Sequence, residues 1–106
     1  MQREFNQEML QKLNSIYPVL GTNVIEATPE HWNDFSLHMK ATGASVALSI
    51  SSNEGHNDLV GVTNEIVTVV AEIQHIMSEY NSMFMEAIFK VWMENDKWKF
   101  DFEPTF

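Results

Sequence analysis

Several residue types are scarce or absent in this sequence of 106 residues, and each shortage removes a class of structure or function. Cysteine is absent, which excludes disulfide frameworks, thiolate metal sites and cysteine nucleophiles. Lys and Arg together number 6, against 15 Asp and Glu, so the net charge is −9. Binding to nucleic acid or to an anionic membrane through phosphate groups needs the opposite balance, so we expect neither as a partner.

Motifs for nucleotide binding and for membrane insertion are also missing. The four glycines are isolated, so the sequence has neither a dinucleotide-binding fingerprint nor a phosphate-binding loop. The uncharged run at residues 41–53 is too short and too polar to span a bilayer, and the first residues form no apolar leader. We therefore expect a cytoplasmic protein with a single domain over residues 1–106.

Two segments have the periodicity of amphipathic helices, with apolar residues three or four positions apart. The first covers residues 2–16 and is expected to end before Pro18, because the residue before a proline disfavours the helical conformation. The second covers residues 64–81. A short helical turn at residues 28–32 is predicted between them, with Thr28 as its N-cap. The apolar stripe of the second helix contains Ile66, Val69, Val70, Ile73, Ile76, Met77 and Tyr80.

Alternation of apolar and polar residues predicts a first β-hairpin within residues 35–51. Centring its turn on residues 42–43 pairs Leu37 with Leu48 and keeps the apolar side chains of both strands on one face. The short apolar segment at residues 59–62 is a candidate edge strand.

A second hairpin is predicted from residues 85–94 and 97–103, which alternate on either side of a two-residue Asn-Asp turn. That turn pairs Val91 with Phe100 and directs six apolar side chains to one face. The order of helix, hairpin, helix and hairpin indicates an α+β domain. We expect an antiparallel sheet of four to five strands, made of two hairpins, with two main helices packed on it.

Residues with catalytic or metal-binding chemistry form no motif. The four histidines, at positions 31, 38, 56 and 75, show neither H-x-H nor H-x-x-x-H spacing. No serine nucleophile motif is present, and no acid lies at an evidently buried position. We therefore expect no cofactor, no metal and no enzymatic activity. The alternative is a small hydrolase or ligand-binding domain, which requires a pocket lined by aromatic side chains with converging polar groups.

Acidic residues are concentrated in one part of the sequence. Residues 41–89 contain no Lys or Arg but six acids. Seven residues come close to two full helical turns, so acids at this interval line one strip of the second helix, where His75 joins them. A solvated face without a role and a docking surface for a basic partner both fit this pattern. Four acids recur at this interval: Asp58, Glu65, Glu72 and Glu79.

The outer face of the second hairpin is another candidate surface. Trp92 and Ile88 alternate there with charged residues. A tryptophan on a charged strand face either anchors a partner or is covered by another segment of its own chain. A contact between two copies of the chain through these two residues is a third hypothesis. The candidate partner-binding residues are therefore Glu54, Asp58, Glu65, Glu72, His75, Glu79 and Trp92.

Two short motifs resemble those of a known family. One is the P-x-x-W sequence of Pro29 and Trp32, and the other is the run Lys99, Phe100, Asp101 and Phe102 in the last predicted strand. Over about residues 24–106, the sequence resembles the YezG-like immunity proteins of bacterial polymorphic toxin systems, including contact-dependent growth inhibition.

The resemblance implies an inhibitor rather than an enzyme. Such a protein binds the C-terminal domain of a cognate toxin, here expected as a monomer in a 1:1 heterodimer. Many of these toxins are nucleases, whose substrate clefts must be basic. The resemblance thus implies neutralisation of a basic nuclease by occlusion with an acidic surface.

Overall fold

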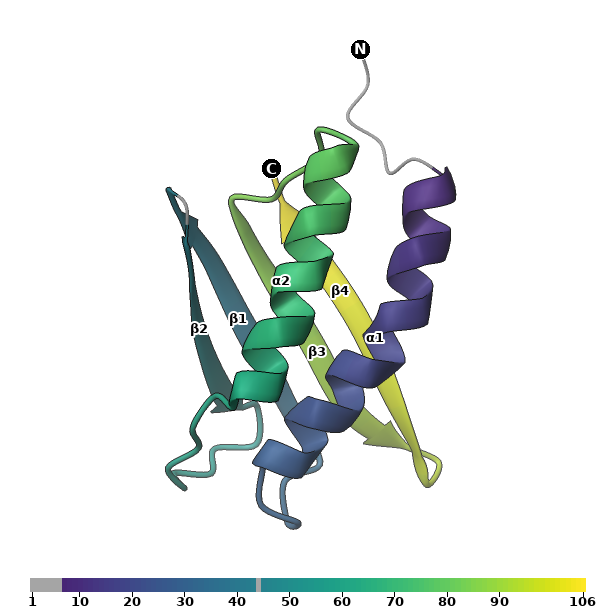
Figure 1. The fold of residues 1–106 in the computed structure, drawn as a ribbon. Helices are drawn as coiled ribbons and strands as arrows, with labels where there is room; N and C mark the ends of the chain where they lie inside the picture. Colours follow the sequence, from purple (N-terminus) through teal and green to yellow (C-terminus); the bar gives the residue numbers. More distant parts are fainter. Residues whose placement is uncertain (1–6, 44) are drawn as a thin grey trace.

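The computed structural model describes residues 7–43 and 45–106. These residues form two helices and four strands in two layers, with both helices on one face of the sheet (Figure 1). The strands form one antiparallel sheet in the order β2-β1-β3-β4, which confirms the predicted α+β fold. Along the chain the elements are α1 (Gln7–Ala27), β1 (Asp34–Thr42), β2 (Ser45–Ser52), α2 (Asn64–Glu79), β3 (Glu86–Glu94) and β4 (Lys97–Thr105).

The hydrophobic core lies between the sheet and the two helices. The strands β1 and β3 are central, so their inward side chains are fully buried, whereas those of the edge strand β4 are half-buried. Burial of this apolar surface is the main force that holds the two layers together. The largest fully buried side chains are Phe35, Phe84, Phe89, Met9, Leu13, Leu20, Leu37, Met39, Ile66, Ile73, Met77 and Val24.

The helix α1 continues through Pro18 to Ala27, so the prediction that it ends before the proline was wrong. An interior proline costs about 3 kcal/mol, because it lacks an N–H donor and its ring clashes with the preceding turn. Beyond it, Leu20 and Val24 are buried, and burial of each contributes about 1.5–3 kcal/mol. Packing therefore outweighs the local penalty, and the helix bends midway (Figure 1). Residues 2–6 of the predicted helix lie outside the described residues.

Two other predicted segments differ in the structure. Residues 28–32 form a single turn closed by a hydrogen bond from Trp32 N to Pro29 O (3.0 Å). The hydroxyl of Thr28 does not cap a helix there but donates to the carbonyl of Ile25 at the end of α1 (2.9 Å). The predicted edge strand at residues 59–62 is a loop.

That loop is explained by how its apolar side chains pack. Val60 and Val62 contact the core, whereas Leu59 between β2 and α2 is fully exposed. The backbone of residues 59–62 is irregular, and no strand of the described sheet pairs with it. The sheet therefore has four strands within the described residues.

The two hairpins differ in how well their registers were predicted. The second has Val91 opposite Phe100, as predicted. The first is shifted by two residues, with Leu37 opposite Ile50, so the predicted pairing with Leu48 was wrong. A shift of two leaves every side chain on its own face, so alternation does not reveal it. The turn decides the register of this hairpin, because the observed pairing places the left-handed conformation on Gly43 (φ 65°). Glycine adopts that conformation without strain.

The helix α2 confirms the second predicted helix and ends two residues earlier than predicted, at Glu79. Thr63 is its N-cap, and the Thr63 Oγ1 atom accepts a hydrogen bond from Ile66 N (3.2 Å). The predicted apolar stripe faces the core, where Ile66, Val69, Val70, Ile73 and Met77 are buried and Ile76 and Tyr80 are partly buried.

Candidate functional site

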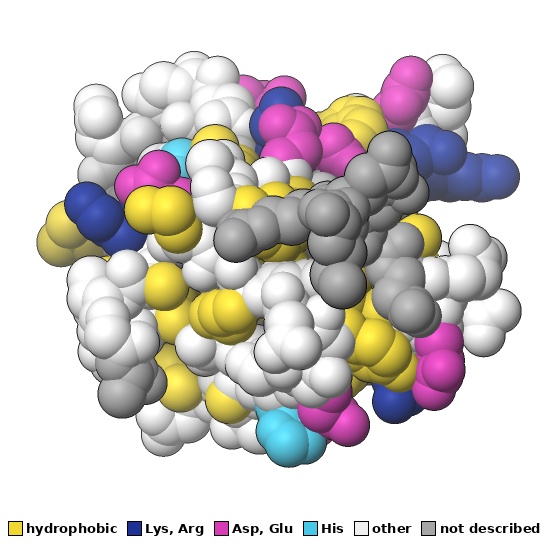
Figure 2. All heavy atoms as spheres, turned by 90° about the horizontal axis from the view of Figure 1, so that it is seen from above, with side chains coloured by type: hydrophobic (Ala, Val, Ile, Leu, Met, Phe, Trp, Pro, Cys, Tyr) yellow, Lys and Arg dark blue, Asp and Glu magenta, His cyan; other side chains and the backbone are white. Residues whose placement is uncertain are grey.

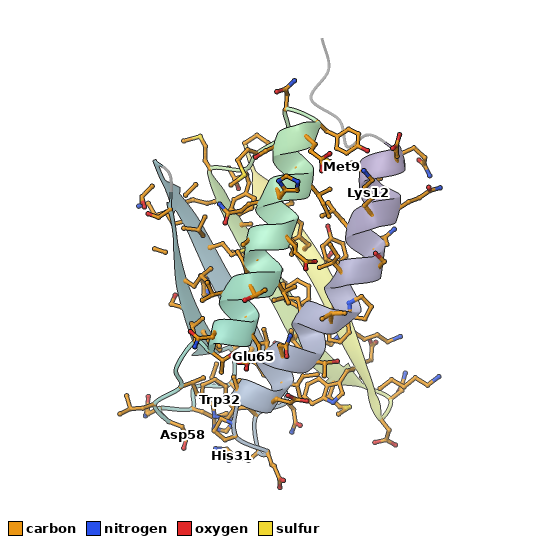
Figure 3. The ribbon with its side chains drawn as sticks, in the orientation of Figure 1. Met9, Lys12, His31, Trp32, Asp58 and Glu65 are labelled. Atoms are coloured by element: carbon orange, nitrogen blue, oxygen red, sulfur yellow. The ribbon has the colours of Figure 1, made fainter. Side chains whose placement is uncertain are left out.

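The outward face of α2 carries the predicted acidic strip, which we define as Glu65, Glu72 and Glu79. All three are exposed, and they lie beside the apolar stripe that packs on the core. Glu65 lies in the first turn of the helix (Figure 3). Among the described residues, neither Glu65 nor Glu72 forms an ion pair. The negative charge of this strip is therefore largely uncompensated.

His75 lies within the strip and is also exposed. His75 Nε2 is 3.5 Å from Glu79 Oε1, one helical turn further along. A shallow groove of about 500 Å³ runs beside the strip and is lined by Thr68, Ala71, Glu72, His75 and Ile76. The strip and the groove together present carboxylates next to a small apolar surface.

The other two predicted acids, Glu54 and Asp58, lie in the loop before α2 and are exposed, but each accepts hydrogen bonds from elsewhere in the chain. Glu54 Oε1 accepts hydrogen bonds from the backbone N–H groups of Asn33 (2.7 Å) and Asp34 (3.2 Å). Asp58 Oδ2 accepts one from Trp32 Nε1 (2.9 Å). These contacts fasten the loop before α2 to the beginning of β1, so both carboxylates have a structural role.

These hydrogen bonds also change the acidity of the two carboxyl groups. The backbone N–H of Asn33 holds the pKa of Glu54 below its usual value. The indole N–H of Trp32, followed by the imidazole of His31, lowers the pKa of Asp58 in the same way. A donor that points at a carboxylate stabilises the charged form, so both groups stay ionised under ordinary conditions.

The face of the sheet opposite the helices carries Trp92. No helix or strand among the described residues covers this face, and Trp92 is half-exposed on it. A shallow groove of about 590 Å³ beside it includes His38 and Lys90 in its lining. Lys90 Nζ is 2.8 Å from Glu103 Oε2, so the charges here are largely paired. That pairing raises the pKa of Lys90. This surface is therefore mixed in charge, unlike the strip on α2.

The end of the molecule that carries the C-terminus of α2 is also mixed in character. Figure 2 shows this end from above, with hydrophobic, acidic and basic side chains interspersed. Met85 is among the exposed hydrophobic side chains of the chain. Neither a single sign of charge nor a large apolar area dominates the visible part of this end.

One cluster of functional side chains was missed by the sequence analysis. His31, in the turn after α1, lies beside His56, with ring centroids 4.8 Å apart. His31 Nε2 is 2.8 Å from Asp58 Oδ2, and the ring of Trp32 stacks on that of His56 at 5.9 Å. Figure 3 shows His31, Trp32 and Asp58 together at the end of the molecule where β1 begins. No local spacing reveals this cluster, because His31 and His56 are far apart in the sequence.

Comparison with models of known protein families finds no match, and comparison with curated proteins finds none either. No helix within the described ranges is long and apolar enough to cross a membrane. Functional inference therefore depends on the geometry and charge of the surfaces described above.

Proposed function

We propose that this protein is an immunity protein that binds a basic toxin domain in the cytoplasm and neutralises it without catalysing a reaction. The observation that carries this proposal is the acidic strip on α2, defined above by Glu65, Glu72 and Glu79. It consists of exposed carboxylates on a helix whose neighbouring apolar stripe is fixed in the core. The overall net charge of −9 has the same sign.

The physical argument concerns the partner's cleft. A nuclease holds the phosphates of its substrate with Lys and Arg, so its cleft carries positive charge. An acidic helix offers carboxylates in the place of those phosphates and excludes the substrate by occupying the cleft. Charge of opposite sign also accelerates encounter and selects against wrong partners. Exposed charges are screened over about 8 Å at physiological salt, so the strip acts mainly at short range.

The size of the chain is sufficient for such a contact. A stable interface buries about 800 Å² on each partner. The accessible surface of this protein is 6684 Å², so an interface of that size covers only a small part of it. In the proposed 1:1 heterodimer, the rest of the surface remains in water.

A genetic experiment tests the proposal. The reading frame directly upstream should encode a secreted protein with a basic C-terminal domain, and that domain expressed alone in bacteria should stop growth. Co-expression of this chain should restore growth, and the two proteins should purify together in a 1:1 complex. Continued growth arrest in the presence of this chain would show that the proposal is wrong.

A further inference from the structure

Two histidines and an aspartate meet where α1 gives way to β1. His31 comes from the turn after α1, and His56 and Asp58 come from the loop before α2. One potential ligand atom of each lies within 4.8 Å of those of the other two. Two imidazoles and one carboxylate are a ligand set that Zn²⁺ favours. We propose that these three residues bind Zn²⁺, with a fourth coordination position open to water. This inference does not rest on the proposed function.

The distances are close to those that a metal site requires. A tetrahedral zinc site with bonds of about 2.0–2.2 Å places its ligand atoms roughly 3.4 Å from one another. His31 Nε2 and Asp58 Oδ2 are 2.8 Å apart, and the widest separation within the cluster is at most 4.8 Å. The required displacement is about 1.5 Å or less, which rotation of side chains in a turn and a loop provides.

The ligands are held by a second set of contacts. Trp32 is only 2% exposed, and its Nε1 donates to Asp58 Oδ2 (2.9 Å), so the carboxylate is oriented by a residue anchored in the core. The same indole stacks on His56, and His56 Nε2 lies 3.3 Å from Glu54 Oε1. Carboxylates that orient a ligating imidazole are a regular feature of zinc sites.

The local charge also favours a divalent cation. Glu54 and Asp58 are both carboxylates, and no Lys or Arg occurs in residues 41–89, the stretch that contains this loop. With neutral imidazoles, Asp58 in the cluster and Glu54 beside it carry two negative charges, which one Zn²⁺ ion balances. The metal would then join the turn at residues 28–32 to the loop before α2, and its binding energy would add to the stability of the fold.

The experiment uses the full chain without an affinity tag, treated with a chelator and then dialysed. Titration with Zn²⁺ alone, followed by calorimetry, should show one site per chain, and Co²⁺ alone should give the visible absorption of a four- or five-coordinate ion. The substitution His31→Gln should weaken binding at least about tenfold, because it removes one of three protein ligands. His31 has a side chain that is 56% exposed, so this variant should fold normally, which circular dichroism would verify.

The matched control is His75→Gln. His75 also lies beside a carboxylate, with His75 Nε2 3.5 Å from Glu79 Oε1, but it lies outside the cluster. Binding that is lost in His31→Gln and kept in His75→Gln supports the proposed site. The proposal is overturned if the parent protein takes up no Zn²⁺ in excess metal, if His31→Gln binds as tightly as the parent, or if His75→Gln abolishes binding.

Discussion

The ring of Phe100 lies directly against the backbone of Gly21: a Cβ atom at position 21 would stand 2.3 Å from Cε1 of that ring. This contact joins the second half of α1 to the edge strand β4. The same ring stacks on Phe89, with centroids 5.9 Å apart and planes inclined by 19°. The ring is therefore held between a helix backbone and a buried aromatic side chain, and close packing leaves it little room to move.

We expect Gly21→Ala to destabilise the protein. Alanine gains about 1 kcal/mol in helix propensity, but forcing the Phe100 ring aside costs more. The net loss should be about 1–3 kcal/mol in the free energy of unfolding, measured with urea. In a Phe100→Leu background the same change should be neutral or stabilising, because the obstructing ring is gone. An alanine variant as stable as the parent would contradict the packing described.

Pro18→Ala should have the opposite effect. Pro18 is exposed, and alanine restores the N–H that bonds to the carbonyl of Asn14 in a regular helix. The substitution removes the helix penalty of about 3 kcal/mol from the folded state. It also gives the unfolded chain more conformational freedom, which lowers stability by about 1 kcal/mol. A gain of about 1–2 kcal/mol in the free energy of unfolding is expected. A loss of stability would indicate that the bend itself is needed to seat α1 on the sheet.

Thr63→Ala should remove the N-cap of α2. The Ile66 N–H then loses its acceptor, and the free energy of unfolding should fall by about 0.5–2 kcal/mol. Thr63→Ser keeps the hydroxyl and is the matched control, expected to stay close to the parent. Equal losses in both variants would show that the threonine methyl group, rather than the cap, is responsible.

The carboxyl group of Asp58 should make stability depend on pH. Its folded-state pKa is lowered, first by Trp32 and then by His31, below an unfolded value of about 3.9. Its contribution is therefore complete above that unfolded value and is lost as the pH falls through the lower folded-state pKa. Asp58→Asn should be less stable than the parent at pH 7, and the difference should shrink below about pH 4. Urea unfolding at pH 7 and at acidic pH measures the stability of Asp58→Asn and of the parent. The variant Asp96→Asn is the control for the loss of one exposed charge.

The acidic strip on α2 can be tested by removing its charge. Changing Glu65, Glu72 and Glu79 together to Gln should slow association with the basic partner at least about tenfold at low salt and flatten its salt dependence. The matched control replaces exposed acids elsewhere, in the triple variant Glu26→Gln, Glu30→Gln and Asp96→Asn. Both variants lose three negative charges, so stopped-flow rates that differ between them assign the effect to the strip. Equal rates in the two variants would exclude the strip as the docking surface.

Local patterns were enough to predict part of the fold. The helix α2 follows from its apolar periodicity, and the second hairpin follows from alternation around a turn in which Asn95 and Asp96 adopt left-handed conformations. Exposure of the strip also follows from the sequence, since the acids at seven-residue intervals share one line of the helix outside the apolar stripe. These features depend on residues close together in the chain, where helical and strand periods act directly.

Other features depend on contacts between distant residues and only the tertiary structure decided them. Burial of Leu20 and Val24 carries α1 past Pro18, against the local preference for a break. Trp32 and the residues at the start of β1 bind the carboxylates of the two loop acids, so Asp58 is held in the loop before α2 although the heptad spacing groups it with the strip. The same folding brings His31 beside His56. The amino-acid sequence by itself determined where helical and strand periods run. The packing of distant segments decided that α1 continues past the break expected at Pro18, and it decided which distant side chains meet. The reason is that long-range burial outweighs local conformational preference.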